Sequence, residues 1–217
     1  MIRMMGGTEF PMEILVDGPA SAPATLVLAH GAGAAMDSAF MTAMAQGLAD
    51  RGWRVVRFEF PYMARQRLGG RKSAPDRMPV LQACFRAQVE RVRGQGPLLI
   101  GGKSMGGRIA SLLADELVVA GCLCLGYPFH PPGRPDNLRI EHLVTLHTPT
   151  LILQGERDSF GRRAEVEGYP LSPAVKLAWL TAGDHSFKPT RSSGLSELEN
   201  WHQAIAKADQ FLGRILG

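Results

Sequence analysis

Three side chains that could together carry out nucleophilic catalysis, Ser104, Asp158 and His185, are spread along this chain of 217 residues. A serine hydroxyl becomes an effective nucleophile when an imidazole accepts its proton and a carboxylate holds that imidazole in one tautomer. Each of the three residues comes shortly after an apolar run that is typical of a strand. Their order along the chain differs from the orders found in the two common types of serine protease. The pattern predicts acyl transfer through a covalent serine intermediate.

Ser104 lies in the sequence Gly102-Lys103-Ser104-Met105-Gly106. Residues 98–100 predict a buried strand before it, and the apolar spacing after it predicts a helix that reaches Leu117. A serine on so sharp a turn needs a strained backbone, and side chains two residues to either side of it would collide. The segment therefore indicates a nucleophile turn, in which the start of the helix also directs N–H groups at a developing oxyanion.

Two other interpretations of the same segment compete with the nucleophile turn. Gly-Lys-Ser also occurs in phosphate-binding loops, but such a loop needs a glycine at the position where this chain has Pro97. The other alternative is a strand, a turn and a helix in which the glycines serve packing alone. The motifs in the rest of the chain favour the nucleophile turn.

Apolar runs separated by turn residues predict that strands and helices alternate along the chain. Strands are expected at residues 13–16, 25–29, 53–60, 98–100, 122–125, 150–153 and 175–180. Helices are expected after Asp37 or Ser38, over 81–92, after Ser104, over 163–167 and over 196–215, whereas residues 61–80 and 126–148 are expected to be irregular. This alternation predicts an α/β protein with a mostly parallel sheet covered by helices on both faces. Ligands of such sheets bind beyond the carboxyl ends of the strands, where Ser104, Asp158 and His185 should meet.

Other carboxylates and histidines in the sequence could take the places of Asp158 and His185. Asp158 ends a strand in Gln-Gly-x-x-Asp, whose glycine lets the carboxylate turn toward the site, and His185 lies in a loop before the last helix. Glu156 and Asp184 are alternative carboxylates, but Asp184 directly precedes the histidine, which makes a tautomer-fixing contact awkward. The other histidines lack the spacing of metal ligands, so no metal is expected and they are interpreted as surface or loop residues: His130, His142, His147 and His202.

An oxyanion needs two N–H donors, and two segments could provide them. One donor is expected from Met105, the residue after the nucleophile. The other is expected from the glycine-rich turn after His30, with Ala32 as the first choice and Gly31 and Gly33 beside it. We expect His30 to support this turn through hydrogen bonds without transferring a proton.

Positive charge gathers in the segment after the third strand. Arg65, Arg67 and three further basic residues fall within thirteen positions that hold a single acidic residue, Asp76. This segment is expected to be a solvated loop, although Tyr62, Arg65 and Arg67 lie at the sheet edge where they could contact substrate. Lys103 is likewise expected to be solvated, with contact to an acidic substrate group as the alternative.

Composition narrows the class of protein. The chain has 45% hydrophobic residues, 20% charged residues and a formal net charge of +4, which is too small an excess to indicate nucleic-acid binding. Met1 to Phe10 lacks the apolar core of a signal peptide, and no segment is long enough to span a membrane. The three cysteines form no framework of pairs. Cys122 and Cys124 alternate on a predicted strand and indicate buried thiols in a reducing compartment, so a cytoplasmic location is expected.

One early segment resembles a dinucleotide-binding unit, because a strand, the sequence Gly31-Ala32-Gly33, a helix and a strand ending near Glu59 follow one another. The third small residue of that fingerprint would be Met36, which is too large for close packing of the strand on the helix. A nicotinamide enzyme would also leave Ser104 without a role. No cofactor is therefore expected.

The motifs, taken together, resemble the α/β-hydrolase superfamily over essentially the whole chain, and most closely its small dienelactone-hydrolase-like branch. The matching segments are His30–Gly33, Gly102–Gly107, Gln154–Asp158 and Gly183–Lys188. Dienelactone hydrolases use a cysteine where this chain has Ser104, a departure that argues against lactone cleavage. The motifs Gly-Lys-Ser-Met-Gly-Gly and Asp-His-Ser-Phe-Lys also resemble a subgroup whose eukaryotic relatives include a domain of a chromatin-modifying complex.

The resemblance implies one α/β-hydrolase domain over residues 1–217, with no cap domain because only about two dozen residues separate two central strands where relatives insert one. A shallow site and a small soluble ester or thioester substrate follow. The sequence thus predicts a serine carboxylesterase without a cofactor and without nucleic-acid or membrane partners. Two alternatives stay open, namely a non-catalytic interaction module and an acyltransferase that uses the same residues.

Overall fold

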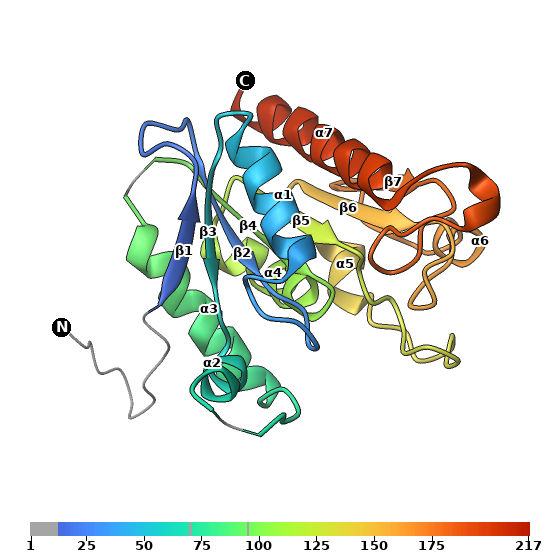
Figure 1. Cartoon of the computed structure of the whole chain (residues 1–217), viewed down its shortest axis with the longest axis horizontal. Helices are drawn as coiled ribbons and strands as arrows, with labels where there is room; N and C mark the ends of the chain where they lie inside the picture. Colours follow the sequence, from blue (N-terminus) through green and yellow to red (C-terminus); the bar gives the residue numbers. More distant parts are fainter. Residues whose placement is uncertain (1–12, 70, 95) are drawn as a thin grey trace.

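The computed structural model describes residues 13–69, 71–94 and 96–217. The expectation for Met1 to Phe10 therefore lies outside the described residues. The described chain forms one seven-stranded sheet in the order β1-β3-β2-β4-β5-β6-β7 (Figure 1). The strands are β1 (Ile14–Asp17), β2 (Thr25–Ala29), β3 (Arg54–Phe58), β4 (Leu98–Lys103), β5 (Gly121–Leu125), β6 (Thr150–Gly155) and β7 (Val175–Leu180).

All the strands except β1 run parallel, which confirms the predicted mostly parallel sheet. The central strands β2, β4, β5 and β6 are buried along their whole length, as expected for strands covered on both faces. Their apolar runs therefore read as continuous and not as alternating. Each parallel strand ends at the same edge of the sheet, so the residues that follow the strands converge there.

Helices cover both faces of the sheet (Figure 1). The helices α1 (Ala39–Ala49) and α7 (Glu197–Leu216) pack on one face through an apolar cluster that includes Met44, Leu48 and Ile205. The helices α3 (Met78–Val92) and α4 (Met105–Leu117) pack on the other face through a second cluster. The buried sides of these helices repeat every three to four residues, which is why the sequence pattern located them.

Two segments that were expected to be irregular contain helices. Residues 61–67 form α2 (Pro61–Arg67), because a proline at the first helical position has a suitable φ and needs no N–H partner there. Between β5 and β6 lies α5 (Glu141–Thr145), which has five residues. The expected short helix after Arg162 is present as α6 (Arg163–Val166), and a 3₁₀ turn spans Arg191–Ser193.

The connection between β5 and β6 carries no cap domain. Residues 126–149 are all described and contain only α5 as regular structure. Among the described residues, none of the helices combines the length and the apolar composition that crossing a bilayer requires.

Candidate active site

Ser104 is the hinge between β4 and α4 and has φ 51° and ψ −112°. This left-handed conformation is costly for a residue with a side chain, and it holds the hydroxyl above the edge of the sheet. The Ser104 N–H donates to the Leu125 carbonyl at 3.0 Å, which ties the turn to the end of β5. The serine is partly exposed, so a substrate can reach it.

The glycines on either side of the serine have no space for a side chain. A Cβ on Gly102 would lie 2.5 Å from the Gly106 carbonyl carbon and 2.7 Å from the Ala29 oxygen. A Cβ on Gly106 would lie 2.6 Å from the carbonyl oxygens of both Ala29 and His30. These distances are far inside van der Waals contact, so the collision expected from the sequence is present in the structure.

The structure brings the three predicted residues into one chain of hydrogen bonds. His185 Nε2 lies 2.8 Å from Ser104 Oγ, and His185 Nδ1 lies 2.7 Å from Asp158 Oδ2. The phenyl ring of Phe160 covers the imidazole, with the ring centroids 4.3 Å apart. A hydroxyl, an imidazole and a carboxylate in this sequence can deprotonate the hydroxyl and return the proton to a leaving group.

Asp158 is fully buried, and its carboxylate is held by three donors. His185 shares Oδ2 with the side-chain amide of Gln154, which donates at 2.8 Å, while the Phe160 N–H donates to Oδ1 at 2.9 Å. Gln154 also accepts the Tyr127 N–H at 2.7 Å and so couples the end of β5 to the carboxylate. Sequence reasoning did not assign a role to Gln154, although a glutamine buried at the end of a strand signals a polar partner nearby.

The pKa of His185 is lowered from its ordinary value. Burial is the largest cause, and the positive charge of Lys103 acts in the same direction, while the hydrogen bond to Asp158 opposes both. The imidazole is therefore neutral at pH 7, as a general base must be.

The two rival carboxylates have other partners. Asp184 accepts the N–H groups of Ser186 at 2.8 Å and Lys188 at 3.0 Å, so it shapes its own turn. Glu156 accepts the Ala182 N–H at 2.9 Å and forms an ion pair with Arg163. Neither carboxylate holds the imidazole.

The turn after β2 lies against the serine, as expected for a segment that supplies an oxyanion donor. A Cβ on Gly31 would lie 3.7 Å from the Ser104 Cβ, while Ala32 and Gly33 are exposed. Met105 is the first residue of α4, and the first N–H groups of a helix lack intrahelical acceptors. Both predicted segments thus lie next to Ser104, and their role as oxyanion donors stays a prediction.

Tyr62 and His30 hold this turn through hydrogen bonds to its carbonyl groups. The buried Tyr62 hydroxyl donates to the carbonyls of Gly31 at 3.2 Å and Ala32 at 3.0 Å, so it positions the turn and is not free to bind substrate. His30 Nε2 accepts the Phe60 N–H at 3.0 Å, which leaves Nδ1 to donate to the Gly31 carbonyl at 2.7 Å. The predicted supporting role of His30 agrees with these contacts.

Arg65 and Arg67 are paired with carboxylates in the structure, and their contact with substrate stays a prediction. Arg67 forms ion pairs with the buried Glu59 at 2.6 Å and with Asp37 at 2.9 Å, and Arg65 pairs with Asp76 at 2.6 Å. Both guanidinium groups lie on α2, where carboxylates already neutralise them. The sequence did not reveal these pairs because Asp37 and Glu59 come from other segments.

Lys103 is buried and not solvated, contrary to expectation, with 8% of its surface exposed. Its Nζ donates to the His185 carbonyl at 2.6 Å and lies 5.5 Å from the centroid of the Phe40 ring. Burial lowers the pKa of Lys103 to about 8, while the charges of Asp158 and Asp184 oppose that shift. The lysine next to the nucleophile therefore belongs to the site.

Two of the histidines interpreted as surface or loop residues lie in the connection between β5 and β6 and are at least partly buried. His130 is buried, and its Nε2 lies 3.4 Å from Glu165. His142 is partly buried, with Nε2 2.9 Å from Ser111 Oγ. Within residues 13–69, 71–94 and 96–217, no three His, Cys, Asp or Glu side chains are grouped so that they could hold a metal ion.

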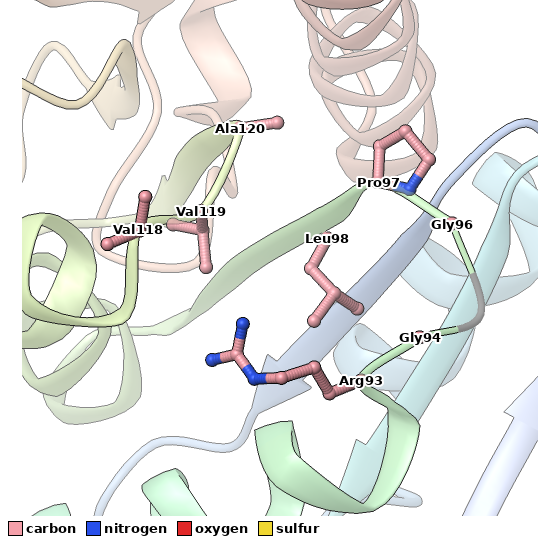
Figure 2. Close-up of a pocket in the computed structure, with 8 residues that line it drawn as sticks. All are labelled: Arg93, Gly94, Gly96, Pro97, Leu98, Val118, Val119 and Ala120. Carbon is pink, nitrogen blue, oxygen red and sulfur yellow. The ribbon is translucent and has the colours of Figure 1, made fainter.

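A hollow of about 370 Å³ lies at the opposite edge of the sheet from Ser104, where β4 and β5 begin (Figure 2). Its lining is mainly glycine, proline and apolar side chains, with Arg93 as its charged residue. It offers no nucleophile and no general base, so we place the chemistry at the carboxyl edge.

Comparisons with known proteins agree with this fold. A family model described as an alpha/beta hydrolase domain matches residues 22–213. A serine hydrolase without a lid from Xanthomonas campestris is 21% identical, with a TM-score of 0.67 over 89% of this chain and 86% of the other. A dienelactone hydrolase from Anabaena variabilis is 17% identical, with a TM-score of 0.73 over 99% and 95%. An alpha-beta serine hydrolase homologue from Coxiella burnetii is 19% identical, with a TM-score of 0.71 over 94% and 99%.

Proposed function

The chain belongs to the alpha/beta hydrolase family, and from that premise we propose that it is a serine carboxylesterase. Its substrate is a small soluble ester or thioester, cleaved through an acyl-enzyme formed on Ser104. One observation carries this proposal, namely the hydrogen-bonded chain from Ser104 Oγ through His185 to the buried Asp158, with contacts of 2.8 and 2.7 Å.

The first half of the reaction forms the acyl-enzyme. His185 Nε2 takes the proton of Ser104 as Oγ attacks the carbonyl carbon of the ester, and a tetrahedral oxyanion forms. The same imidazole then gives that proton to the leaving alcohol or thiol as the bond to it breaks. In the second half, a water loses its proton to His185, attacks the acyl carbon and releases the acid, and the proton returns to Ser104.

Asp158 holds the imidazole in the tautomer whose Nε2 is free to accept a proton, and its charge stabilises the imidazolium that forms. The donors from Gln154 and Phe160 keep the carboxylate oriented, because a buried carboxylate with three partners has little freedom to rotate. The charge of Asp158 thus offsets part of the cost of protonating a buried imidazole, the cost that lowers the pKa of His185.

The backbone N–H groups of Met105 and Ala32 stabilise the oxyanion in this proposal. Tyr62 and His30 support the second donor by fixing the carbonyls of the same turn. Such donors act strongly because they are oriented before the charge develops.

The proposed size of the substrate follows from the connection between β5 and β6. Since residues 126–149 contain only the short helix α5, no helical cap encloses a long acyl chain. The partly exposed serine favours a short ester that water can reach for the second step.

A fluorophosphonate probe tests the proposed function, because it reacts covalently with activated serines. We expect labelling of the unaltered protein, no labelling of Ser104→Ala and at least a hundredfold slower labelling of His185→Ala. Absence of labelling in the folded, unaltered protein would contradict the proposal and favour a non-catalytic interaction module. Adding a competing alcohol during ester cleavage separates hydrolysis from acyl transfer, since transfer would yield a new ester.

A further inference from the structure

A second group of polar side chains borders the nucleophile turn on α4. The Arg108 N–H donates to the Ser104 carbonyl at 3.0 Å, so this arginine begins the next helical turn after the serine. Four residues advance a helix by about 6 Å and return to the same side of it. Arg108 therefore lies one turn from the site of bond cleavage.

Arg139 lies in the connection between β5 and α5. Its N–H donates to the Phe129 carbonyl at 2.8 Å, and its own carbonyl accepts the Tyr127 hydroxyl at 2.8 Å. Both contacts anchor Arg139 to residues that follow β5, at the carboxyl edge of the sheet. Figure 1 shows this connection at the same end of the sheet as the turn after β2.

The charges of these two arginines are not compensated within the part of the chain that the structure describes. Neither guanidinium forms an ion pair there, and Arg108 Nε is buried without a hydrogen-bond partner. Arg67, by contrast, contacts two carboxylates. A buried donor without a partner is costly, and an anion that accepted its hydrogen bond would remove that cost.

The neighbours of the pair add polarity but no negative charge. Burial, together with the charge of Arg108, lowers the pKa of His142 to about 4, so its imidazole is neutral at pH 7. The pKa of Arg139 is lowered too, first by burial and then by the like charge of Arg108. Ser111 and Tyr127 supply neutral hydroxyl groups beside them. The Tyr127 hydroxyl, which bonds the Arg139 carbonyl, lies 3.5 Å from His142 Nε2, and that nitrogen lies 2.9 Å from Ser111 Oγ on α4. Ser111 is three residues after Arg108 and so shares its side of the helix, which brings the segment of Arg139 against that side of α4. Two arginines on facing segments, neither in an ion pair within the described residues, make a place suited to an anion.

We propose that Arg108 and Arg139 bind an anionic group, a carboxylate or a phosphate, carried by the ester that Ser104 attacks. This inference rests on the proposed function and narrows its substrate class to short esters with a negative charge near the scissile bond. A guanidinium donates two parallel hydrogen bonds to either kind of anion, which fixes the substrate as well as attracting it.

Matched esters test the inference. Mono(4-nitrophenyl) glutarate and the 4-nitrophenyl ester of 4-phosphonobutyric acid carry a carboxylate and a phosphate-like group, and 4-nitrophenyl pentanoate is the neutral reference. Acetoxyacetate, compared with ethyl acetate, places the charge on the alcohol side. The quantity compared is the ratio of kcat/KM for the charged ester to that for its neutral reference.

We expect the unaltered enzyme to favour at least one charged ester, and Arg108→Gln and Arg139→Gln each to lower the ratio roughly 10- to 100-fold, the range for losing a charge-assisted hydrogen bond. Arg108→Lys keeps the positive charge but loses the paired N–H donors of the guanidinium, so this variant should retain part of the ratio that Arg108→Gln loses. Arg134→Gln is the control, because Arg134 is exposed in the same connection, and its ratio should not change. Thermal melts of each variant verify folding.

An unaltered enzyme that favours no charged ester, or a preference that survives both substitutions, would overturn the inference. In either case fluorophosphonate labelling of Ser104 would still stand, because it needs neither arginine, so failure here is separable from failure of the proposed function. Calorimetric titration with glutarate and with inorganic phosphate gives a readout without turnover. Binding that is lost in Arg108→Gln supports the site, and no binding to the unaltered protein counts against it.

Discussion

Lys103 Nζ donates a hydrogen bond of 2.6 Å to the backbone oxygen of His185, so the residue before the nucleophile holds the loop of the proposed base. Lys103 is fixed at the end of β4, whereas His185 lies in the connection between β7 and α7. The contact therefore joins two segments that must keep their relative positions for Nε2 to stay 2.8 Å from Ser104 Oγ.

Replacing Lys103 should change the pH dependence of ester cleavage. The charged groups that face His185 are Lys103 from β4, Asp158 after β6 and Asp184 from its own loop. Since the positive charge of Lys103 lowers the pKa of His185, removing it raises that pKa, and the imidazole becomes protonated at higher pH. We expect the acid limb of kcat/KM to move to higher pH in both Lys103→Gln and Lys103→Met.

The two substitutions separate charge from positioning. Glutamine keeps an N–H donor, on a side chain one bond shorter, whereas methionine has none. We therefore expect kcat on the alkaline plateau to be lower in Lys103→Met than in Lys103→Gln by roughly tenfold, about the worth of one hydrogen bond. An acid limb that stays in place in both variants would show that the charge of Lys103 does not act on the base.

Asp158→Asn should remove most of the activity and leave the fold intact. An asparagine has nearly the same shape, but its amide can donate to Nδ1 and so favour the tautomer in which Nε2 carries the proton. We expect kcat to fall roughly 10³- to 10⁴-fold with a small change in KM. Asp184→Asn is the matched control, because Asp184 contacts backbone N–H groups and not the imidazole. A similar fall in kcat in both variants would contradict the role of Asp158 as the residue that orients the imidazole.

The glycine before the nucleophile should tolerate no side chain. Because a Cβ on Gly102 would lie 2.7 Å from the Ala29 oxygen, Gly102→Ala must displace the backbone of β2 or α4. We expect a loss of about 1–3 kcal/mol in the free energy of unfolding, together with lost labelling of Ser104. Gly213→Ala provides the comparison, since nothing lies within 4 Å of its Cβ and alanine favours the helix α7. Denaturant titration measures the stability of each variant, and the fluorophosphonate probe measures labelling of Ser104. Equal stability of the two variants would contradict the steric argument.

Most of the fold could be predicted from the sequence because its signals are local. The buried strands are apolar runs, and the rule that parallel strands present ligands at their carboxyl ends places Ser104, Asp158 and His185 together without coordinates. The glycines around the serine carried the same information, since Gly102 and Gly106 are required by one turn.

The missed features depend on contacts between distant segments. The buried position of Lys103 follows from a hydrogen bond to a residue 82 positions later, and the partners of Arg67 lie on β3's end and in the turn after β2. The helix α2 could not be predicted, because a segment rich in arginine and close to several glycines has the composition of a solvated loop. Gln154 has the same explanation, because its role needs the end of β5 beside it.

The hydroxyl of Tyr62 should matter for rate more than for binding. It donates to the carbonyls of Gly31 and Ala32, so Tyr62→Phe releases the turn that carries the proposed second oxyanion donor while keeping the buried ring. Because that donor acts on the transition state and not on the bound ester, we expect kcat to fall roughly 10- to 100-fold with KM nearly unchanged. Tyr169→Phe removes a hydroxyl that makes no hydrogen bond within the described residues, and its kcat should stay near that of the unaltered enzyme. If Tyr62→Phe instead raises KM at constant kcat, the hydroxyl contacts substrate directly and the turn needs no such support.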